Sequence, residues 1–470
     1  MEKTLTGIDS LVSFKNSKGR NGRGTLIHIT RTSIVFEVYN PYSIVQFSEV
    51  LPHLEVIRGE RVIYKGRVVV SHLLSTGLMT IVSATLVDAW SDLNGLMPGK
   101  ELRTETERFI QDWVSGHQIL PGYQLIVGTL RNFLAELNRW LEEAEVGNFG
   151  IEEPGELEQL MEDFYKDTHG PVMPKFVDLF EEFETEAAKV DSEEIMVHKS
   201  FARRELHPLI LCAPYVDRSY NKPLGYAGDY ELINMTMRTS TAGKVSVYAK
   251  LIHNFCVETV ATVGHRNRIT MLQDRLHDEA VRVVEEEERL FSVLNIGCGP
   301  SLEVQRFVRD DELSNQTSFQ LMDFEPLAID YSKEKVSDAI REGGNRPMVK
   351  YTLKSIDDLL KEVHEQGNLY PAAFDFIYCA GLFDYFSDQV CKRLVEQYYR
   401  WLRPGGLLSV TNVHSRNPNR QLMEHLLEWH LVYRDDNHME SLAPDSTKFD
   451  VVTDVTGVSV FLDIRKPKND

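Results

Sequence analysis

The chain has 470 residues, of which 42% are hydrophobic and 26% charged, so it is long enough for more than one globular domain. Its formal net charge of −20 excludes a general nucleic-acid binder, because such a protein needs a basic surface to displace counterions. The sequence lacks a signal peptide, any CxxC pair and the roughly 18-residue apolar run of a membrane span, so we expect a cytoplasmic protein without a metal site.

Residues 1–95 consist of short β-branched segments separated by Gly, Asn and Pro, a pattern that predicts a small antiparallel barrel or sandwich. The stretch GRNGRGTLIHITRTSIVFEV resembles the PilZ family, and this resemblance implies a PilZ-like β-barrel. The family has an RxxxR pair where this chain has Arg20 and Arg23, three residues apart. Its second motif is replaced around His28, Thr30 and Ser33. These departures argue against binding of cyclic di-GMP and favour a docking or regulatory role, through a protein partner or a dimer contact.

Two helical regions follow the predicted barrel. Residues 96–200 carry apolar residues at spacings of three and four, as in QLIVGTLRNFLAELNRWLEEAE, which predicts a helical linker domain. Residues 201–290 contain SYNKPLGYAGDYELINM and then a long helical pattern in which Gly264 predicts a break. Arg266 and Arg268 lie in this pattern and are expected to be exposed, with a carboxylate partner as the alternative.

Strands alternate with helices from residue 291 to the end of the chain. This alternation predicts an α/β domain around a mostly parallel sheet. The last two predicted strands, WHLVYRD and VSVFLDIRKP, are expected to close the sheet in antiparallel fashion, with Tyr433 and Arg434 at a pocket edge.

The stretch VLNIGCGPSLE combines a buried strand, a tight turn and a helix start. Gly297 and Gly299 allow positive φ and a close approach of the backbone to a ligand. The next strand ends in Asp323, 24 residues beyond Gly299, where an acid can accept hydrogen bonds from ribose hydroxyls. A dinucleotide site needs a third glycine where this chain has Leu302, and no GxxxxGK[ST] phosphate loop is present. The ligand predicted here therefore has ribose and adenine but no phosphate, which fits S-adenosylmethionine.

Five motifs in order resemble class I S-adenosylmethionine-dependent methyltransferases: VLNIGCGP, LMDFEPLAIDYS, YTLKSIDDL, FDFIYCAGLFDYFSD and WLRPGGLLSVTNV. The resemblance implies that residues 291–470 form a Rossmann-like catalytic domain with a mostly parallel seven-stranded sheet. It also implies that residues 201–290 form a helical lid and substrate-binding segment. S-adenosylmethionine is the implied cofactor.

The resemblance implies cofactor contacts position by position. Gly297 and Gly299 pass the methionine and ribose portion, and Asp323 binds the ribose hydroxyls. Many family members have an acid where Ser355 stands, so Asp357 is an alternative contact to the adenine amino group. The other implied contacts are Cys298, Phe324, Ile356, Cys379, Ala380 and Asp229. Cys298 and Cys379 are interpreted as small buried residues rather than as nucleophiles.

Four residues are candidates for catalysis or substrate binding. Tyr226 and Asp229 are expected to contact the methionine end or the substrate, with Asp229 as a helix cap as the alternative. His414 follows the fifth strand, where a general base would stand, and a loop histidine with a structural hydrogen bond is its alternative. Asp384 is a further pocket candidate.

The substrate prediction rests on a narrower resemblance. LGYAGDY, the GCGP turn and WHLVYRDDNHMESLAP resemble bacterial enzymes that synthesise 3-hydroxy fatty-acid methyl esters, which act as quorum signals. This implies O-methylation of a fatty or similar small carboxylate, which is already ionised at neutral pH and needs no base. Two alternatives remain open: a methyltransferase acting on another small molecule or a protein, and a regulatory protein that binds S-adenosylmethionine without catalysis.

Overall fold

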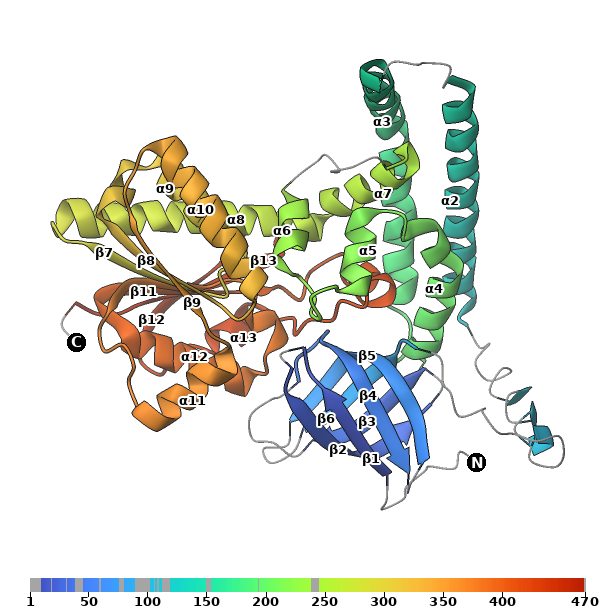
Figure 1. Cartoon of the computed structure of the whole chain (residues 1–470), viewed down its shortest axis with the longest axis horizontal. Helices are drawn as coiled ribbons and strands as arrows, with labels where there is room; N and C mark the ends of the chain where they lie inside the picture. The colour runs from blue at the N-terminus through green and yellow to red at the C-terminus, as the bar shows by residue number, and fades with distance from the viewer. Residues whose placement is uncertain are drawn as a thin grey trace. The chain divides into compact units, whose positions relative to one another are not determined.

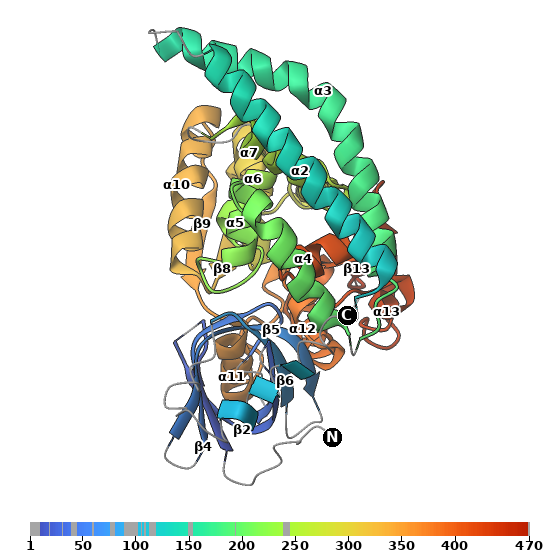
Figure 2. The same cartoon turned by 90° about the vertical axis from the view of Figure 1, so that its right-hand side faces the viewer.

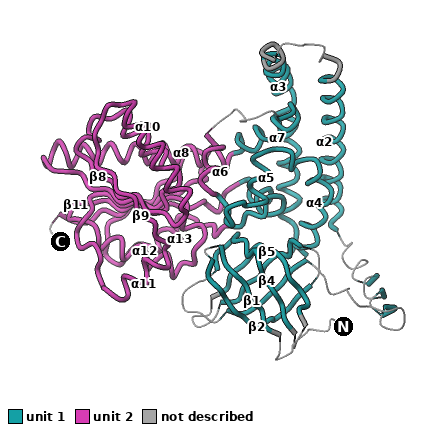
Figure 3. Tube along the Cα trace, in the orientation of Figure 1, with its two compact units in different colours: residues 1–228, 238–259, 418–430 teal, residues 229–237, 260–417, 431–470 magenta. Residues whose placement is uncertain are grey.

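A computed structural model describes residues 10–468, apart from 18, 31, 39–44, 59–60, 76–79, 89–101, 105, 108–109, 112–118, 149–153, 193 and 238–244. The chain divides into two compact units (Figure 3). One unit comprises residues 1–228, 238–259 and 418–430, and the other comprises residues 229–237, 260–417 and 431–470. Each unit therefore contains segments that are far apart in the sequence.

The N-terminal part of the first unit is a closed antiparallel barrel of six strands in the order β1-β2-β3-β6-β5-β4 (blue in Figure 1). Buried and exposed residues alternate along β2, so apolar side chains fill the barrel interior. Phe14, Phe36 and Tyr64 are among the buried residues of this core. The predicted barrel is thus confirmed. Its strands are Ser10–Lys15, Asn21–Ile29, Ser33–Val38, Val50–Arg58, Arg61–Ser75 and Thr80–Leu86.

Helices form the rest of the first unit. The long helices α2 and α3 lie side by side in both views and pack through the rings of Phe133 and Phe176, whose centroids are 5.8 Å apart (Figures 1 and 2). No helix in the described part of the chain is both long enough and apolar enough to cross a bilayer. The helices of this unit are α2 (Pro121–Asn148), α3 (Pro154–Ala187), α4 (Ile195–Ile210), α5 (Pro214–Asn221) and α7 (Val247–Glu258).

The segment 418–430 belongs to the first unit although it follows strands of the second. Glu184 of α3 accepts hydrogen bonds from the backbone N–H groups of Gln421 and Leu422, at 2.8 and 2.7 Å. Burial raises the pKa of Glu184 to about 7, and the two N–H groups oppose this rise. Arg203 of α4 donates to the carbonyl oxygen of His425 at 2.6 Å. Buried hydrogen bonds to helices of the first unit therefore hold this segment.

The second unit is built on a seven-stranded sheet in the order β12-β13-β11-β10-β7-β8-β9. Five neighbouring strands are parallel, and β13 is antiparallel to both β11 and β12. The mostly parallel sheet is therefore confirmed. The strand order reverses between β7 and β10, and ligands of such sheets bind at the carboxyl ends of the strands at this reversal. The strands are β7 (Phe291–Ile296), β8 (Thr317–Asp323), β9 (Met348–Leu353), β10 (Phe374–Cys379), β11 (Leu402–Val413), β12 (Lys448–Thr453) and β13 (Ser459–Arg465).

Helices cover both faces of this sheet (Figure 1). On one face, α8, α9 and α10 bury apolar side chains in a core that includes Leu276, Phe307 and Val336. On the other face, α11 and α12 pack in a second core that includes Leu359 and Trp401. These helices are α8 (Val260–Ala280), α9 (Leu302–Asp310), α10 (Pro326–Gly343), α11 (Ile356–Gln366) and α12 (Asp388–Trp401).

Two sequence predictions about local structure are wrong. Helix α8 runs through Gly264 without a break. The glycine serves packing instead, because a Cβ at this position would stand 2.9 Å from the Cβ of Val458. The segment WHLVYRD is no strand; Arg434 alone makes an isolated bridge, to His414. Its backbone bonds elsewhere, since Val432 donates to the carbonyl oxygen of Asp384 at 2.7 Å. The antiparallel edge is β12 instead.

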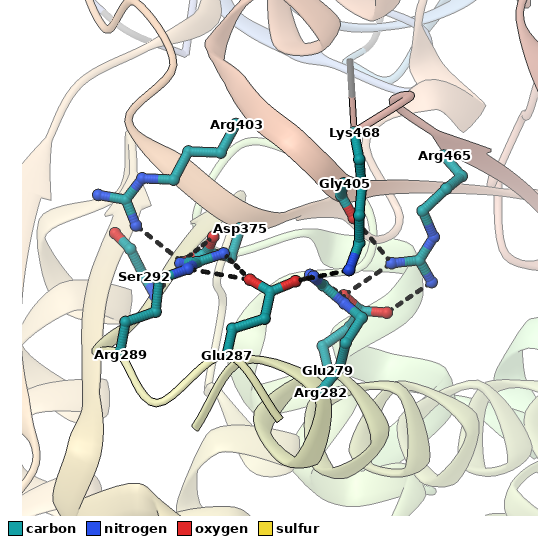
Figure 4. Close-up of polar contacts among 10 residues, drawn as sticks. All are labelled: Glu279, Arg282, Glu287, Arg289, Ser292, Asp375, Arg403, Gly405, Arg465 and Lys468. Carbon is teal, nitrogen blue, oxygen red and sulfur yellow. Dashed lines mark hydrogen bonds and ion pairs between the residues drawn. The ribbon is translucent and has the colours of Figure 1, made fainter. Parts of the chain in front are cut away.

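An ionic network lies at the amino end of β7 and β10 (Figure 4). The carboxylate of Asp375 is fully buried, and it accepts from the backbone N–H of Ser292 at 2.9 Å. Arg289 and Arg403 pair with its two oxygens at 2.5 and 2.8 Å. Asp375 therefore links the starts of two neighbouring strands to the loops beside them.

Replacing Asp375 by alanine is expected to lower the free energy of unfolding by about 2 kcal/mol, because the N–H of Ser292 loses a buried acceptor. Arg289 and Arg403 are partly exposed and can turn to water, which limits the loss. Urea unfolding measures the effect. Asp310→Ala, which removes an exposed pair with Arg309, is the control and should change stability by less than about 0.5 kcal/mol. Equal stability of the two variants would contradict the role of Asp375.

Candidate functional site

The turn after β7 is fixed to the neighbouring strand β8. The backbone N–H groups of Gly297 and Cys298 both donate to the carbonyl oxygen of Met322, at 2.8 and 3.0 Å. Gly297 has a φ of +71° and Gly299 one of +49°, which glycine adopts without steric cost. A Cβ at Gly297 would collide with Leu382, whereas a Cβ at Gly299 would meet no atom within 4 Å. The turn is thus rigid, and its backbone at Gly299 borders open space.

Asp323 lies beside this turn at the end of β8. Its Oδ2 accepts from the N–H of Gly299 at 2.9 Å, and its Oδ1 accepts from the N–H of Glu325 at 3.0 Å. Burial raises the pKa of Asp323 above its ordinary value, while these backbone donors oppose the rise. The backbone N–H of Phe324 is a third donor to this carboxylate. Because the two oxygens together accept about four hydrogen bonds, the carboxylate is held in place and keeps acceptor capacity for one more donor.

The residues after β9 lie next to Asp323, since the N–H of Lys354 donates to its carbonyl oxygen at 2.8 Å. Ser355 caps α11: its Oγ accepts from the N–H of Asp358 at 3.1 Å and donates to the carboxylate of Asp358 at 2.6 Å. Ile356 is buried in the apolar core, and Asp357 is half-buried in the first turn of α11. The structure thus brings this predicted adenine edge beside the predicted ribose acid, with the Ser355 side chain engaged in a cap.

The end of β10 contributes a second backbone edge. Cys379 is fully buried, Ala380 is half-buried, and Gly381 has a φ of +85°. Thr411 accepts from the N–H of Gly381 through its Oγ1 at 3.2 Å. Burial raises the pKa of the Cys379 thiol, and also that of Cys298, well above the ordinary range. Both thiols are therefore protonated at neutral pH and fit the interpretation as small buried residues.

Asp384 follows in the short helical turn Phe383–Tyr385 and is also buried. Its Oδ1 accepts from the N–H of Val413 at 2.6 Å. Burial raises the pKa of Asp384 above its ordinary value, and the nearby guanidinium of Arg268 opposes part of this rise. The carboxylate therefore joins the loop after β10 to the end of β11.

His414 follows β11 and is 1% exposed. Its Nδ1 accepts from the N–H of Arg416 at 2.9 Å, and its Nε2 lies 3.7 Å from Oδ1 of Asp436. This assignment places the ring proton of the neutral tautomer on Nε2, because Nδ1 acts as an acceptor. A general base needs a free lone pair, and that of Nδ1 is engaged. The geometry favours the structural hydrogen bond over the catalytic alternative for this histidine.

The two candidates upstream of the sheet differ in their setting. Asp229 is buried and caps α6 (Tyr230–Thr236), since its Oδ1 accepts from the N–H of Leu232 at 2.9 Å. The helix cap is the alternative role that the sequence analysis gave for Asp229. Tyr226 is half-buried and belongs to the first unit, so its contact with the site stays a prediction. Among the described residues, no group of three or more His, Cys, Asp or Glu side chains is arranged to hold a metal ion.

The site contains two charged residues that the sequence analysis did not place there. Glu303, in the first turn of α9, is buried and accepts from the hydroxyl of Tyr378 at 2.8 Å and from Asn295 at 3.0 Å. Arg268 of α8 is 7% exposed, and its Nη2 lies 3.3 Å from a Cβ built on Gly381. A sequence signal existed for Arg268: it is four residues from Gly264 and from Leu272, on the packed face of the helix.

Part of this region is similar to a known family. Residues 293–406 match the family described as a methyltransferase domain. The matched region runs from β7 into β11. No curated protein matches the chain.

Solved structures similar to this chain have low identity to it. They include a possible exported protein from Bordetella parapertussis, with 14% identity over 52% of this chain and 81% of that one, at a TM-score of 0.39. The N-methyltransferase NodS from Bradyrhizobium japonicum has 14% identity over 43% of this chain and 87% of its own, at a TM-score of 0.30. Magnesium protoporphyrin IX methyltransferase from Synechocystis has 10% identity over 50% of this chain and 93% of its own, at a TM-score of 0.35.

Proposed function

We propose that this protein is an S-adenosylmethionine-dependent methyltransferase that esterifies the carboxylate of a small lipid-like acid, such as a 3-hydroxy fatty acid. The observation that carries the cofactor assignment is the contact between Gly299 and Asp323. It places a carboxylate oxygen 2.9 Å from the backbone nitrogen of a turn that has open space at Gly299. This pair is the one expected for ribose recognition in an α/β nucleotide fold.

The residues present fit this cofactor. The open side of Gly299 admits a ligand against the backbone, and Asp323 keeps acceptor capacity for a ribose hydroxyl beside its three backbone donors. Leu302 occupies the position of the third glycine of a dinucleotide site, at the first residue of α9, which favours a ligand without a pyrophosphate. When bound, the cofactor supplies an electrophilic methyl group on its sulfonium.

The side chains of the site favour an acceptor that needs no base. Nδ1 of His414 accepts from the N–H of Arg416, and Oδ1 of Asp384 accepts from that of Val413. A hydroxyl acceptor must lose its proton, whereas a carboxylate is ionised at neutral pH. The role of the protein would then be to align the acceptor with the methyl group and to exclude water. Alignment is the main contribution that a protein can make to a displacement at carbon.

In the same proposal the PilZ-like N-terminal barrel has a docking or regulatory role. Segment 418–430 supports this, because it begins four residues after His414 and bonds to the barrel, where Thr85 of β6 donates to the carboxylate of Glu428 at 2.7 Å. A conformational change in the first unit that alters this bonding would move segment 418–430, and the segment is joined through the backbone to the loop that carries His414.

The test is transfer of labelled methyl from S-adenosylmethionine to a panel of 3-hydroxy fatty acids of different chain length, followed by solvent extraction and mild alkali. Alkali-labile label in the organic phase is the expected result, because carboxyl esters hydrolyse in alkali. Label that resists alkali would point to another acceptor group. Absence of transfer to any acid, by a protein that binds the cofactor, would reject the lipid acid and favour a different small molecule, a protein acceptor or a regulatory role.

A further inference from the structure

Arg268 is a buried cation without an ion-pair partner among the described residues. Its side chain is 7% exposed, and its Nη1 is buried and makes no hydrogen bond in the part of the chain that the structure describes. Burial lowers the pKa of this guanidinium, yet an arginine remains charged at neutral pH. An unpaired buried charge destabilises a fold strongly unless something compensates it. A residue of this kind in a ligand site indicates that an anion binds there.

The acids near Arg268 are engaged with other groups. Asp384 is the strongest opposite charge on it, but its Oδ1 accepts from the N–H of Val413 at 2.6 Å. Glu303 accepts from the hydroxyl of Tyr378 and from Asn295. Burial raises the pKa of both carboxyls. Tyr385 and Cys379 are the other titratable groups that act on Arg268, and both are neutral in their ordinary protonated forms.

The guanidinium of Arg268 lies close to the backbone of Gly381. Gly381 has a φ of +85°, and a Cβ there would stand 3.3 Å from Nη2 of Arg268, so glycine permits this approach. Thr411 fixes this backbone through the N–H of Gly381. Gly381 follows β10, at the carboxyl edge of the sheet where the strand order reverses. The guanidinium therefore lies at the crevice that also contains Gly299 and Asp323.

We propose that Arg268 binds a carboxylate of a ligand in this site. A guanidinium offers two parallel N–H donors, the geometry that a carboxylate accepts best. The proposal rests on the proposed function, in which both the methionine end of the cofactor and the acceptor acid carry such a group. It adds a binding residue to that function: Arg268 accepts a ligand with an ionised carboxylate and rejects its amide or decarboxylated analogue.

The first experiment tests the anion site without cofactor or turnover. The melting temperature of the full chain is measured in sodium formate and in sodium chloride at equal ionic strength. Formate should stabilise the wild type more than chloride does, and Arg268→Met should remove this difference. Arg266→Met is the matched control, because Arg266 lies on the same helix and donates to the carbonyl oxygen of Thr236. A formate effect that persists in Arg268→Met would overturn the proposal.

The second experiment identifies which carboxylate binds. Calorimetry compares S-adenosylmethionine with its decarboxylated form, and kinetics give KM for the acceptor acid. If Arg268 binds the cofactor, Arg268→Met weakens the binding of S-adenosylmethionine at least tenfold and leaves the affinity for the decarboxylated form unchanged. If it binds the acceptor, cofactor affinity is unchanged and KM rises at least tenfold, with partial rescue by Arg268→Lys. Unchanged values for both ligands would reject the assignment.

The two proposals fail in different ways. A wild type that does not bind S-adenosylmethionine but shows the Arg268-dependent formate effect would reject the proposed function and keep the carboxylate site. A wild type that binds the cofactor with no effect of Arg268→Met on any carboxylate ligand would keep the function and reject the role of Arg268.

Discussion

Asp323→Ala is expected to weaken binding of S-adenosylmethionine about 100-fold, because the ribose loses a hydrogen bond to a charged acceptor, worth about 1.5–3 kcal/mol. The carboxylate also fixes the turn through Gly299, so alanine loosens the backbone that the cofactor contacts. Isothermal titration calorimetry on the full chain measures the dissociation constant.

Two further variants separate binding from stability. Asp323→Asn keeps an oxygen that can accept from Gly299 but removes the charge, so we expect a smaller loss of affinity, roughly tenfold. Asp330→Ala changes an exposed acid on α10 and should bind as the wild type does. If folded Asp323→Ala retained wild-type affinity, the ribose contact and with it the cofactor assignment would be wrong.

Arg434→Met is expected to lower the free energy of unfolding by about 4 kcal/mol, because it leaves several buried acceptors unsatisfied at about 1–3 kcal/mol each. Arg434 is 1% exposed and donates to the carbonyl oxygens of Phe383 and Phe386, at 2.8 and 2.6 Å. It also donates to Asn412 at 2.6 Å. Arg434 thus fixes the helical turn that carries Asp384, and its predicted place at a pocket edge stays a prediction.

Urea unfolding of the full chain gives this free energy. Arg416→Met is the control, because Arg416 is exposed and its nearest acid, Asp436, is 3.7 Å away. That variant should change stability by less than about 0.5 kcal/mol. A loss below about 1 kcal/mol for Arg434→Met would mean that the buried acceptors find other donors.

Features that depend on local pattern could be predicted from the sequence. Alternating apolar residues predicted the strands of the barrel, and the alternation of strands and helices predicted the parallel sheet. The turn at Gly297 and Gly299 and the acid at Asp323 could also be predicted, because a strand end followed by glycines constrains the backbone strongly. The contact between Gly299 and Asp323 agrees with that prediction, and the ligand it holds stays a proposal.

Features that depend on distant contacts could not be predicted. Gly264 suggested a break, but Val458, almost 200 residues further on, requires glycine inside the helix. The segment WHLVYRD has the composition of a strand, yet its first two residues belong to the first unit and Val432 bonds to Asp384. The environment of His414 likewise depends on a backbone N–H two residues later, which no residue pattern reveals.

Hydrogen–deuterium exchange of the full chain, with and without S-adenosylmethionine, tests the central claim most directly. We predict that the cofactor slows exchange in peptides that cover residues 293–303, 319–326 and 379–384, and that S-adenosylhomocysteine protects the same peptides. NAD should protect none of them, because its pyrophosphate has no matching glycine at Leu302. Protection confined to the barrel, or equal protection by NAD, would contradict the assignment of this turn to S-adenosylmethionine.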